Sequence, residues 1–392
     1  MSSVLISETE AQCQALTPSA LGQLPRPTPF LACDTSVVGQ QFRALAAQLS
    51  GFDVHYAVKC NPAPEVLSAL AAQGCRFEVA SIGELAMVEA IGTRAADVLF
   101  SNPVKPPAAI AEAHRRGLTR FAFDSECEVR KLAVHAPGSS VYVRLAVDDT
   151  QSRFPLSRKF GADLDEAERL MLLAQDLGLV PYGVTFHVGS QCTDPSAWPR
   201  AIGRCGQLFE RLASHGIQLD MLDIGGGFPV EYTEPTPAIA AIAIAIRAAI
   251  DQLPHPPSVL VAEPGRFLAA GCGVMVATVI GLASRSDGRW AYLDVGGYNG
   301  LMEAVQTGGR WQFPLHTSRA DADFAPHVPF TVTGPTCDAS DTLFYDASLP
   351  AGLEVGDRVY IGMAGAYSLS YASSFNGFPP PELVLVESDR TP

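Results

Sequence analysis

The chain has 392 residues, of which 47% are hydrophobic and 17% charged, and its formal net charge is −14. This composition supplies enough apolar material for a large core, or for two, and excludes an intrinsically disordered chain. The acidic balance argues against a nucleic-acid-binding protein, because such a protein needs a basic face to neutralise phosphates.

We expect no membrane span, no secretion signal, no structural disulfides and no zinc site. The longest aliphatic run, residues 238–246, has nine residues before Arg247, whereas a bilayer span needs about 20. The first residues, MSSVLISETEAQCQ, lack the basic and apolar regions of a signal peptide. Nine cysteines are scattered without a CxxC pair or a Cys/His cluster, which favours a cytoplasmic protein without a metal.

In the first two-thirds of the chain, short apolar runs alternate with Ala- and Leu-rich stretches. This alternation is typical of parallel strands that are buried on both faces and connected by helices. Eight such units predict a (β/α)8 barrel, with a doubly wound open sheet as the alternative. The predicted strands are residues 54–58, 77–79, 98–100, 120–123, 141–145, 183–187, 221–224 and 258–262, and the predicted helices include 64–73, 82–91, 108–116 and 164–177.

Helical periodicity mostly disappears after about residue 272. The following segments are rich in β-branched and aromatic residues and are separated by turn residues, so they predict a second, β-rich domain. Its predicted strands are residues 273–282, 290–295, 330–333 and 358–362.

Lys59 is one of four lysines in the chain, and it follows the predicted strand 54–58, at the end where a barrel places catalytic groups. Partial desolvation there is expected to lower the pKa of the amine. That change favours a nucleophile that can form a Schiff base with pyridoxal phosphate (PLP) or with a carbonyl substrate. A lysine that simply reaches water is an equally good interpretation of these residues alone.

Three other strand ends carry groups suited to binding an anion or a cofactor. The triple glycine Gly225–Gly227 lets backbone N–H groups approach a phosphate, and Arg266 can bind a phosphate through two hydrogen bonds. Glu263 and His187 place a carboxylate and an imidazole at two strand ends. Each feature taken alone also has an ordinary interpretation: a tight turn, a surface ion pair or a core histidine.

In the β-rich part, Cys337 and Asp338 are adjacent in the sequence Gly334–Asp338, which has the composition of a turn. The pair suits a proton donor beside a carboxylate that binds a cation, and a half-buried structural cysteine is the alternative. The segments 365–367 and 374–378 read as turns with packing aromatic residues.

In content and order these motifs resemble those of the ornithine decarboxylase family, the barrel-type PLP-dependent amino-acid decarboxylases. The resemblance extends from about residue 28 to about residue 386. The motifs that carry it are YAVKCN (56–61), FEVAS (77–81), FDSE (123–126), FGA (160–162), FHVGS (186–190), DIGGGFP (223–229), EPGR (263–266), GPTCD (334–338) and FNGF (375–378).

The resemblance implies a (β/α)8 PLP-binding barrel at residues 35–272 and a β-barrel-like domain formed by residues 1–34 and 273–392. It also implies a homodimer with two active sites at the subunit interface. In this family Lys59 would bind PLP covalently, His187 would stack on the pyridine ring and Glu263 would pair with the pyridine nitrogen. The phosphate ligands implied are Ser190, Gly225, Gly226, Gly227, Gly265, Arg266 and Tyr367.

The same resemblance assigns two residues to the substrate, both contributed by the other subunit. Cys337 would protonate the product at Cα, and Asp338 would bind the distal amine. The remaining matches are Glu78, Glu84 and Arg144 around the cofactor, with Glu78 standing where the animal-type pattern has Asp, and Phe375 and Glu303 as further substrate contacts. Glu303 lies in residues 294–314, which align poorly with the family.

The activity implied is the decarboxylation of a basic L-amino acid, first of all L-ornithine to putrescine and CO2. Lysine is one methylene longer, and an apolar pocket discriminates one methylene by only ~1–3 kcal/mol, so lysine, dual or other diamino-acid activity stays open. Asp338 disfavours diaminopimelate, and the Cys337–Asp338 pair disfavours a racemase. A non-catalytic relative of the antizyme-inhibitor type is disfavoured because Lys59, His187 and Glu263 are all present.

Overall fold

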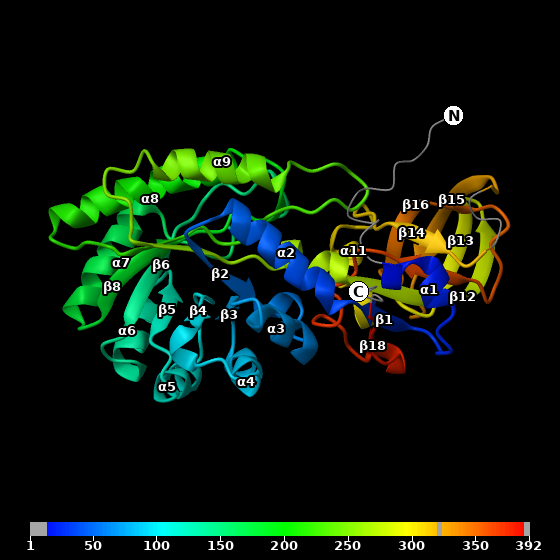
Figure 1. Ribbon diagram of the computed structural model, residues 1–392, viewed down its shortest axis with the longest axis horizontal. Coiled ribbons are helices and arrows are strands. Elements are labelled where there is room, and N and C mark those ends of the chain that lie inside the picture. The colour runs from blue at the N-terminus through cyan, green and yellow to red at the C-terminus, as the bar shows by residue number, and fades with distance from the viewer. Residues whose placement is uncertain (1–13, 320–323, 388–392) are drawn as a thin grey trace, which may run out of the picture. The chain divides into compact units, whose positions relative to one another are not determined.

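The computed structural model describes residues 14–319 and 324–387 (Figure 1). The chain divides into two compact units. The barrel unit comprises residues 41–230 and 236–268, and the β unit comprises the described residues up to 40, residues 231–235 and the described residues from 269 onward.

In the barrel unit, parallel strands close into a barrel in the order β10-β11-β2-β3-β4-β5-β6-β8. Closure is complete because β11 pairs with β2 and β10 with β8. The predicted (β/α)8 barrel is therefore confirmed and the open-sheet alternative is wrong. The strands are β2 (Phe52–Ala57), β3 (Arg76–Val79), β4 (Leu99–Phe100), β5 (Arg120–Phe123), β6 (Ser140–Arg144), β8 (Val180–Thr185), β10 (Met221–Asp223) and β11 (Val259–Ala262). A separate two-stranded antiparallel sheet pairs β7 (Ser152–Phe154) with β9 (Ser190–Cys192), which come from different loops.

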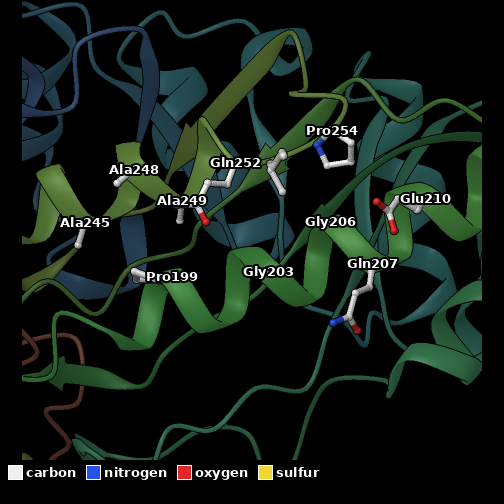
Figure 2. A pocket seen from close by; sticks show the side chains of 11 residues that line it. Pro199, Gly203, Gly206, Gln207, Glu210, Ala245, Ala248, Ala249, Gln252 and Pro254 are labelled. Carbon is white, nitrogen blue, oxygen red and sulfur yellow. The ribbon is translucent and has the colours of Figure 1, made fainter.

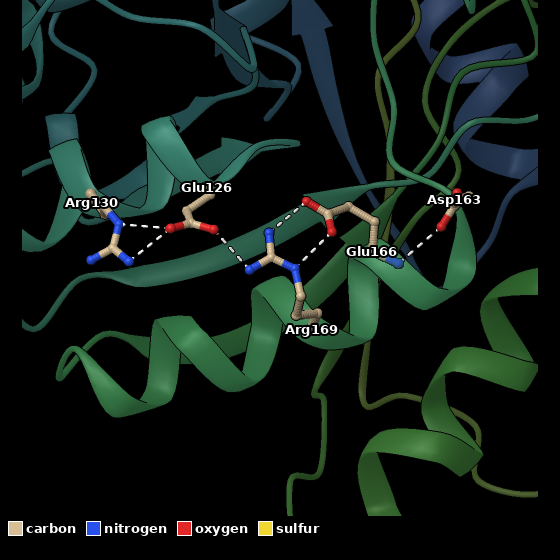
Figure 3. A network of polar contacts seen from close by, with 5 residues as sticks. All are labelled: Glu126, Arg130, Asp163, Glu166 and Arg169. Atoms are coloured by element: carbon tan, nitrogen blue, oxygen red, sulfur yellow. Dashed lines mark hydrogen bonds and ion pairs between the residues drawn. The ribbon is translucent and has the colours of Figure 1, made fainter.

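Helices surround these strands (Figure 1). Local signals set their starts: the Ser81 side chain accepts a hydrogen bond from the N–H of Glu84, and the Asp163 side chain does the same for Glu166. Ion pairs on the outer surface join α6 to α7 through Glu126 and Arg169 (Figure 3). The helices are α3 (Pro64–Ala71), α4 (Ile82–Ala90), α5 (Pro107–Arg115), α6 (Glu126–His135), α7 (Leu164–Asp176), α8 (Ala197–Ser214), α9 (Ile239–Ile250) and the short α10 (Arg266–Ala269).

Side chains fill the interior of the barrel, as expected for a barrel with this number of strands. Strands β4, β5, β6, β10 and β11 contribute one buried cluster, in which Tyr142 is the largest member. The barrel is thus a packed core, and polar chemistry is confined to its ends. The cluster consists of Leu99, Ala122, Tyr142, Met221 and Val261.

The β unit contains an eight-stranded mixed sheet. Its long strand β12 (Gly273–Arg285) pairs with β13 (Gly288–Leu293) and β17 (Arg358–Ile361). The N-terminal strand β1 (Phe30–Cys33) is antiparallel to β12 and parallel to β18 (Glu382–Leu385). The remaining elements are β14 (Leu315–Thr317), β15 (His327–Thr333), β16 (Thr342–Pro350), α1 (Pro18–Gly22) and α11 (Met302–Gln306), while α2 (Thr35–Gln48) runs from this unit into the barrel unit.

None of the helices in the described residues is both long and apolar enough to cross a bilayer. Across residues 14–319 and 324–387 we find no group of His, Cys, Asp and Glu side chains arranged to hold a metal ion. The cysteines in these residues are all free thiols.

Candidate active site

Polar side chains gather at the carboxyl ends of the barrel strands, where barrels carry their active sites. Every one of the eight strands contributes such a residue at one of its last two positions or just after its end. Because the strands are parallel, these residues share one end of the barrel. They are Lys59 (after β2), Glu78 (β3), Ser101 (after β4), Asp124 (after β5), Arg144 (β6), His187 (after β8), Asp223 (β10) and Glu263 (after β11).

Lys59 lies in a short 3-10 turn, Val58–Cys60, directly after β2. Its Nζ is 2.5 Å from Oε2 of Glu78 on the neighbouring strand, and the two side chains are 44% and 2% exposed. Burial acts to lower the pKa of Lys59, but the carboxylates of Glu78 and Glu263 outweigh it and raise that pKa. The expectation of a lowered pKa was therefore wrong, because the neighbouring strand supplies a counter-ion.

Glu263 follows β11 and reaches into the barrel end. The Ser101 hydroxyl donates a hydrogen bond to its Oε1, and the Ser101 oxygen lies 2.8 Å from the Tyr142 hydroxyl. Burial and the carboxylates of Asp223 and Glu78 raise the pKa of Glu263 well above its usual value, while Lys59 and the Ser101 hydrogen bond oppose that rise. Glu263 thus sits where a positively charged ligand would strongly favour its ionised form.

Asp223 ends β10 and is completely buried. Its carboxylate accepts hydrogen bonds from the Thr185 hydroxyl at 2.8 Å and from the Gly225 N–H at 2.9 Å. Burial nevertheless raises the pKa of Asp223 to about 7. Asp223 therefore orders the start of the glycine turn and adds a second acid group beside Glu263.

His187 carries a neutral imidazole. Burial, together with the positive charges of Arg144 and Lys59, lowers its pKa to about 3. Its Nδ1 accepts a hydrogen bond from the Gly189 N–H at 3.0 Å, which assigns the ring proton to Nε2 and fixes the ring orientation. A fixed neutral ring is suited to stacking on an aromatic ligand.

Glycine is required at Gly225–Gly227 because the backbone of neighbouring segments comes very close to all three residues. Gly225 and Gly227 have φ values of +62° and +91°, which favour glycine. A Cβ on Gly225, Gly226 or Gly227 would lie 2.2, 2.5 or 2.3 Å from a carbonyl oxygen of a neighbouring segment. The turn therefore places bare backbone at the end of the barrel. Side chains at these three positions would not fit, and their absence leaves the backbone accessible to an anion.

Ser190 and Arg266 meet beside this turn. The guanidinium Nη2 and Nε of Arg266 lie 3.2 and 3.4 Å from the Ser190 hydroxyl oxygen, and the Phe154 ring covers the guanidinium at 5.3 Å. Arg266 is only 3% exposed. A buried guanidinium and a hydroxyl next to a glycine turn form a donor set that suits a phosphate.

Two other predicted residues have clear structural roles. The Glu84 carboxylate accepts a hydrogen bond from the Ala80 N–H at 2.6 Å in the first turn of α4, and burial raises its pKa. Arg144 ends β6 with its guanidinium 5.4 Å from the centre of the Phe160 ring, and burial lowers its pKa. Gly265 is buried directly before Arg266.

Cys337, Asp338 and Phe375 form a second cluster in the β unit, held together by Tyr298 and Asn376, neither of which the sequence analysis gave a role. The Tyr298 hydroxyl donates to the Asp338 carboxylate at 2.8 Å, and the rings of Tyr298 and Phe375 are 4.5 Å apart. The Asn376 side-chain oxygen accepts from the N–H of Cys337 at 3.1 Å and from its thiol at 3.3 Å. Hydrogen bonds from Ser340 and Tyr298 lower the pKa of Asp338, so this side chain is a carboxylate.

Asp341 is the buried anchor beneath this cluster. Its carboxylate accepts from the Gly297 N–H at 2.7 Å and from the Thr336 hydroxyl at 2.8 Å. A Cβ on Gly296 or Gly334 would lie 2.3 Å from an Asp341 oxygen. Asp341 thus joins the segment that carries Tyr298 to the turn that carries Cys337 and Asp338.

The last two predicted site residues also lie in the β unit. Tyr367 has a φ of +53°, and its ring is 6.2 Å from that of Tyr371. Glu303 is buried in the first turn of α11. The predicted roles of these two residues, a phosphate ligand and a contact to the distal amine, stay predictions.

A separate cavity of about 530 Å³ lies in the helical layer of the barrel unit, between α8 and α9 (Figure 2). Small residues line much of it, including Gly203, Gly206, Ala245 and Ala249. The strand-end residues described above do not contribute to its wall, so it is distinct from the candidate site.

Comparison with known proteins decides what the barrel unit is. Residues 35–270 match the family model described as "Pyridoxal-dependent decarboxylase, pyridoxal binding domain". The chain belongs to this family. It is a PLP-dependent amino-acid decarboxylase, and the resemblance inferred from the motifs is confirmed.

Two relatives match this chain over most of their own length. The lysine/ornithine decarboxylase of Selenomonas ruminantium is 36% identical over 353 residues, covering 90% of this chain and 88% of the relative. The ornithine decarboxylase of Schizosaccharomyces pombe is 34% identical, covering 92% and 84%.

Solved structures share both units of the fold. The lysine/ornithine decarboxylase of Vibrio vulnificus complexed with putrescine has a TM-score of 0.83 and 33% identity, covering 94% of this chain and 96% of the other. The arginine decarboxylase of Paramecium bursaria Chlorella virus bound to agmatine has a TM-score of 0.87 and 28% identity, covering 94% and 100%. The PLP decarboxylases thus include relatives with different basic substrates.

The residues at the end of the barrel fit PLP. The amine of Lys59, the carboxylate of Glu263 and the fixed neutral imidazole of His187 are groups that suit an aldehyde, a protonated ring nitrogen and an aromatic ring face. The glycine turn with Ser190 and Arg266 suits a phosphate.

Proposed function

We propose that the protein decarboxylates a basic L-amino acid, with L-ornithine as the first candidate and lysine as the alternative. The observation that carries this proposal is the group of Lys59, His187 and Glu263 at the end of the barrel, together with the Asp338 carboxylate in the β unit. In the proposed division of the chain, the barrel (35–272) binds PLP and the β domain (1–34 and 273–392) provides the substrate contacts. Free cysteines throughout the described residues agree with the cytoplasmic location that we propose.

In this proposal Lys59 holds PLP covalently, and Glu263 pairs with its ring nitrogen. Ser190, Arg266 and the glycine turn would hold the phosphate. When bound, PLP supplies a sink for the electron pair that stays on Cα after CO2 leaves. The Glu263 carboxylate favours the protonated ring nitrogen, which strengthens that sink.

Lys59 needs to lose a proton before it can act as an amine. The Glu78 carboxylate contacts its Nζ and is the nearest base, so we propose that Glu78 accepts this proton and later returns it. His187 would stack on one face of the ring, because its own orientation is fixed by the Gly189 N–H.

In the β unit, Cys337 and Asp338 are proposed to act on the substrate. The Cys337 side chain, exposed in the isolated chain and oriented by Asn376, would deliver a proton to Cα. The Asp338 carboxylate, fixed by Tyr298, would bind the distal ammonium. Putrescine and cadaverine, the diamines in structures of related enzymes, both carry such a distal ammonium.

We further propose a homodimer in which each active site combines a barrel from one subunit with Cys337 and Asp338 from the other. Mixing Lys59→Ala chains with Cys337→Ala chains tests it. Random exchange makes half of the dimers mixed, and each mixed dimer has one intact site, so about a quarter of wild-type activity should return. Absence of recovery despite proven subunit exchange would show that each chain builds its own site.

The attachment of PLP is tested by borohydride reduction of the holoenzyme and peptide mapping. The label should appear on Lys59, and Lys59→Ala should lose both the absorbance of lysine-bound PLP and nearly all turnover. A label on Lys105, Lys131 or Lys159 would contradict the proposal.

The substrate is tested by CO2 release from ornithine, lysine, arginine, diaminopimelate and D-amino acids. Asp338→Ala should lower kcat/KM for ornithine by at least ~10-fold, because the distal ammonium loses a charge-assisted partner, while PLP absorbance stays. Norvaline has the same carbon chain without the amine and serves as the control. If Asp338→Ala keeps the wild-type preference for ornithine over norvaline, another residue binds the amine, and Glu303 is the next to test.

A further inference from the structure

Ser101 connects two buried groups across the end of the barrel. It directly follows β4, while Glu263 follows β11 and Tyr142 belongs to β6. The Ser101 oxygen contacts both the Oε1 of Glu263 and the hydroxyl of Tyr142. Ser101 is 9% exposed and Tyr142 is completely buried, so neither hydroxyl exchanges these contacts for bulk water without cost.

The chemistry of the three groups fixes the direction of this chain of hydrogen bonds. An ionised Glu263 only accepts hydrogen bonds, so the Ser101 O–H donates to it. The Ser101 oxygen then has a free lone pair, and the Tyr142 O–H donates to Ser101. The hydroxyl dipoles of Tyr142 and Ser101 are thereby aligned so that both favour negative charge on Glu263.

Most neighbours of Glu263 act in the opposite sense. Burial and the Asp223 and Glu78 carboxylates favour the uncharged acid, whereas Lys59 and Ser101 favour the carboxylate. In the proposed function Lys59 is committed to the cofactor. The Arg144 charge and the Ser101 hydroxyl then remain to favour the Glu263 carboxylate, and Ser101 is the one of the two that donates a hydrogen bond to one of its oxygens.

We propose that Ser101, aligned by Tyr142, is a positioning residue that keeps the Glu263 carboxylate ionised and oriented toward the ring nitrogen of PLP. This inference rests on the proposed pairing of Glu263 with that nitrogen. It assigns a role in tuning the electron sink to two residues that touch neither the cofactor's phosphate nor its aldehyde. Loss of the hydroxyl would weaken protonation of the ring nitrogen without removing any ligand of the phosphate.

The matched control is a serine elsewhere in the barrel unit. Ser139 is also buried, but its hydroxyl oxygen has no hydrogen-bond partner within the described residues. Ser139→Ala therefore removes the same atom as Ser101→Ala without removing a contact to Glu263. Ser101→Thr keeps the hydroxyl and serves as the conservative variant, and Tyr142→Phe removes the second hydroxyl of the chain.

The test uses holoenzyme loaded with PLP that carries 15N at the ring nitrogen, and it measures the 15N chemical shift against pH. In Ser101→Ala the pH at which half of the ring nitrogens are deprotonated should fall by about one unit, a tenfold change in the ratio of the two forms. Tyr142→Phe should shift it in the same direction by less, and Ser101→Thr and Ser139→Ala should match the wild type. kcat should fall while the affinity for PLP and KM change little.

The outcomes distinguish a failure of the Ser101 role from a failure of the proposed pairing between Glu263 and the ring nitrogen. If Glu263→Gln leaves the ring nitrogen as protonated as in the wild type, the proposed pairing of Glu263 is wrong. If Glu263→Gln deprotonates the nitrogen but Ser101→Ala and Tyr142→Phe titrate like Ser139→Ala, the role of Ser101 is refuted while the proposed function stands. Should Ser101→Ala fail to fold, the Tyr142→Phe titration decides alone, since an unchanged midpoint in that variant refutes the aligned hydroxyl chain.

Discussion

Lys105 offers a sharp test of how this barrel tolerates buried charge. It is completely buried, and its Nζ donates to the carbonyl oxygens of Asn102 at 2.8 Å and Ala122 at 2.6 Å. Nζ also lies 3.0 Å from a carboxylate oxygen of Glu128, which is 1% exposed and has Lys131 as its second partner. Burial lowers the pKa of Lys105 to about 8, so at pH 7 the ammonium persists.

Lys105→Met keeps most of the volume and removes the charge. The carbonyl groups of Asn102 and Ala122 then lose the Lys105 ammonium as a hydrogen-bond donor. Glu128 keeps Lys131 as its one remaining cation. Removing one partner from a buried ion pair costs about 3–5 kcal/mol, so the free energy of unfolding should fall by about that amount. The assay is urea unfolding at pH 7 followed by far-UV circular dichroism, which reports the loss of the barrel helices.

Arg169→Met provides the control. Arg169 is half exposed and pairs with Glu126 and Glu166 on the surface (Figure 3), where water and salt weaken ion pairs. This variant should unfold close to the wild-type urea concentration. The reasoning is refuted if Lys105→Met is no less stable than Arg169→Met.

Three further predictions concern the glycine turn, pH and the β unit. Gly225→Ala should unfold at a lower temperature than Gly178→Ala, because both positions have positive φ but the added Cβ meets a carbonyl oxygen at 2.2 Å only at Gly225; equal melting temperatures would contradict this. Burial lowers the pKa of His55 from 6.5 to about 3, so between these values the unfolded chain binds the extra proton and stability falls as the pH drops from 6.5 toward 3. His55→Asn should flatten that pH dependence in thermal unfolding, and an unchanged slope would count against it. Tyr298→Phe should lower kcat/KM for ornithine severalfold with PLP absorbance intact, because Asp338 loses the hydrogen bond that orients it; unchanged kinetics would remove Tyr298 from the substrate site.

The sequence was sufficient to predict the barrel because its strands are buried on both faces. Such strands read as continuous apolar runs, and the predicted strand 120–123 agrees with β5 to the residue. The pair of β7 and β9 was missed because each strand has only three residues and the two lie far apart in the sequence. Strand β1 was not singled out because its four residues follow a proline-rich stretch and its partners lie far along the chain.

Site residues that belong to a sequence motif could be predicted. Contacts that depend on which strands lie opposite or next to one another could not. Lys59, His187 and Glu263 follow apolar runs that end at the same edge of the barrel. Ser101 looked like an ordinary residue at a strand end, since its contact to Glu263 crosses the barrel. The predicted direction of the Lys59 pKa shift was wrong for the same reason. The strand pairing that brings Glu78 to the Lys59 amine cannot be inferred from local sequence.

The position of β1 in the β unit affects how the chain can fold during synthesis. Residues 30–33 pair with residues 273–276 and 382–385, so the first of these strands leaves the ribosome long before either partner exists. All strands of the barrel are translated within this interval, whereas β1 cannot have both of its partner strands until residues 382–385 have emerged. A nascent or prematurely terminated chain that lacks β18 therefore exposes an unpaired edge of an apolar strand, which is a substrate for chaperones and a starting point for aggregation.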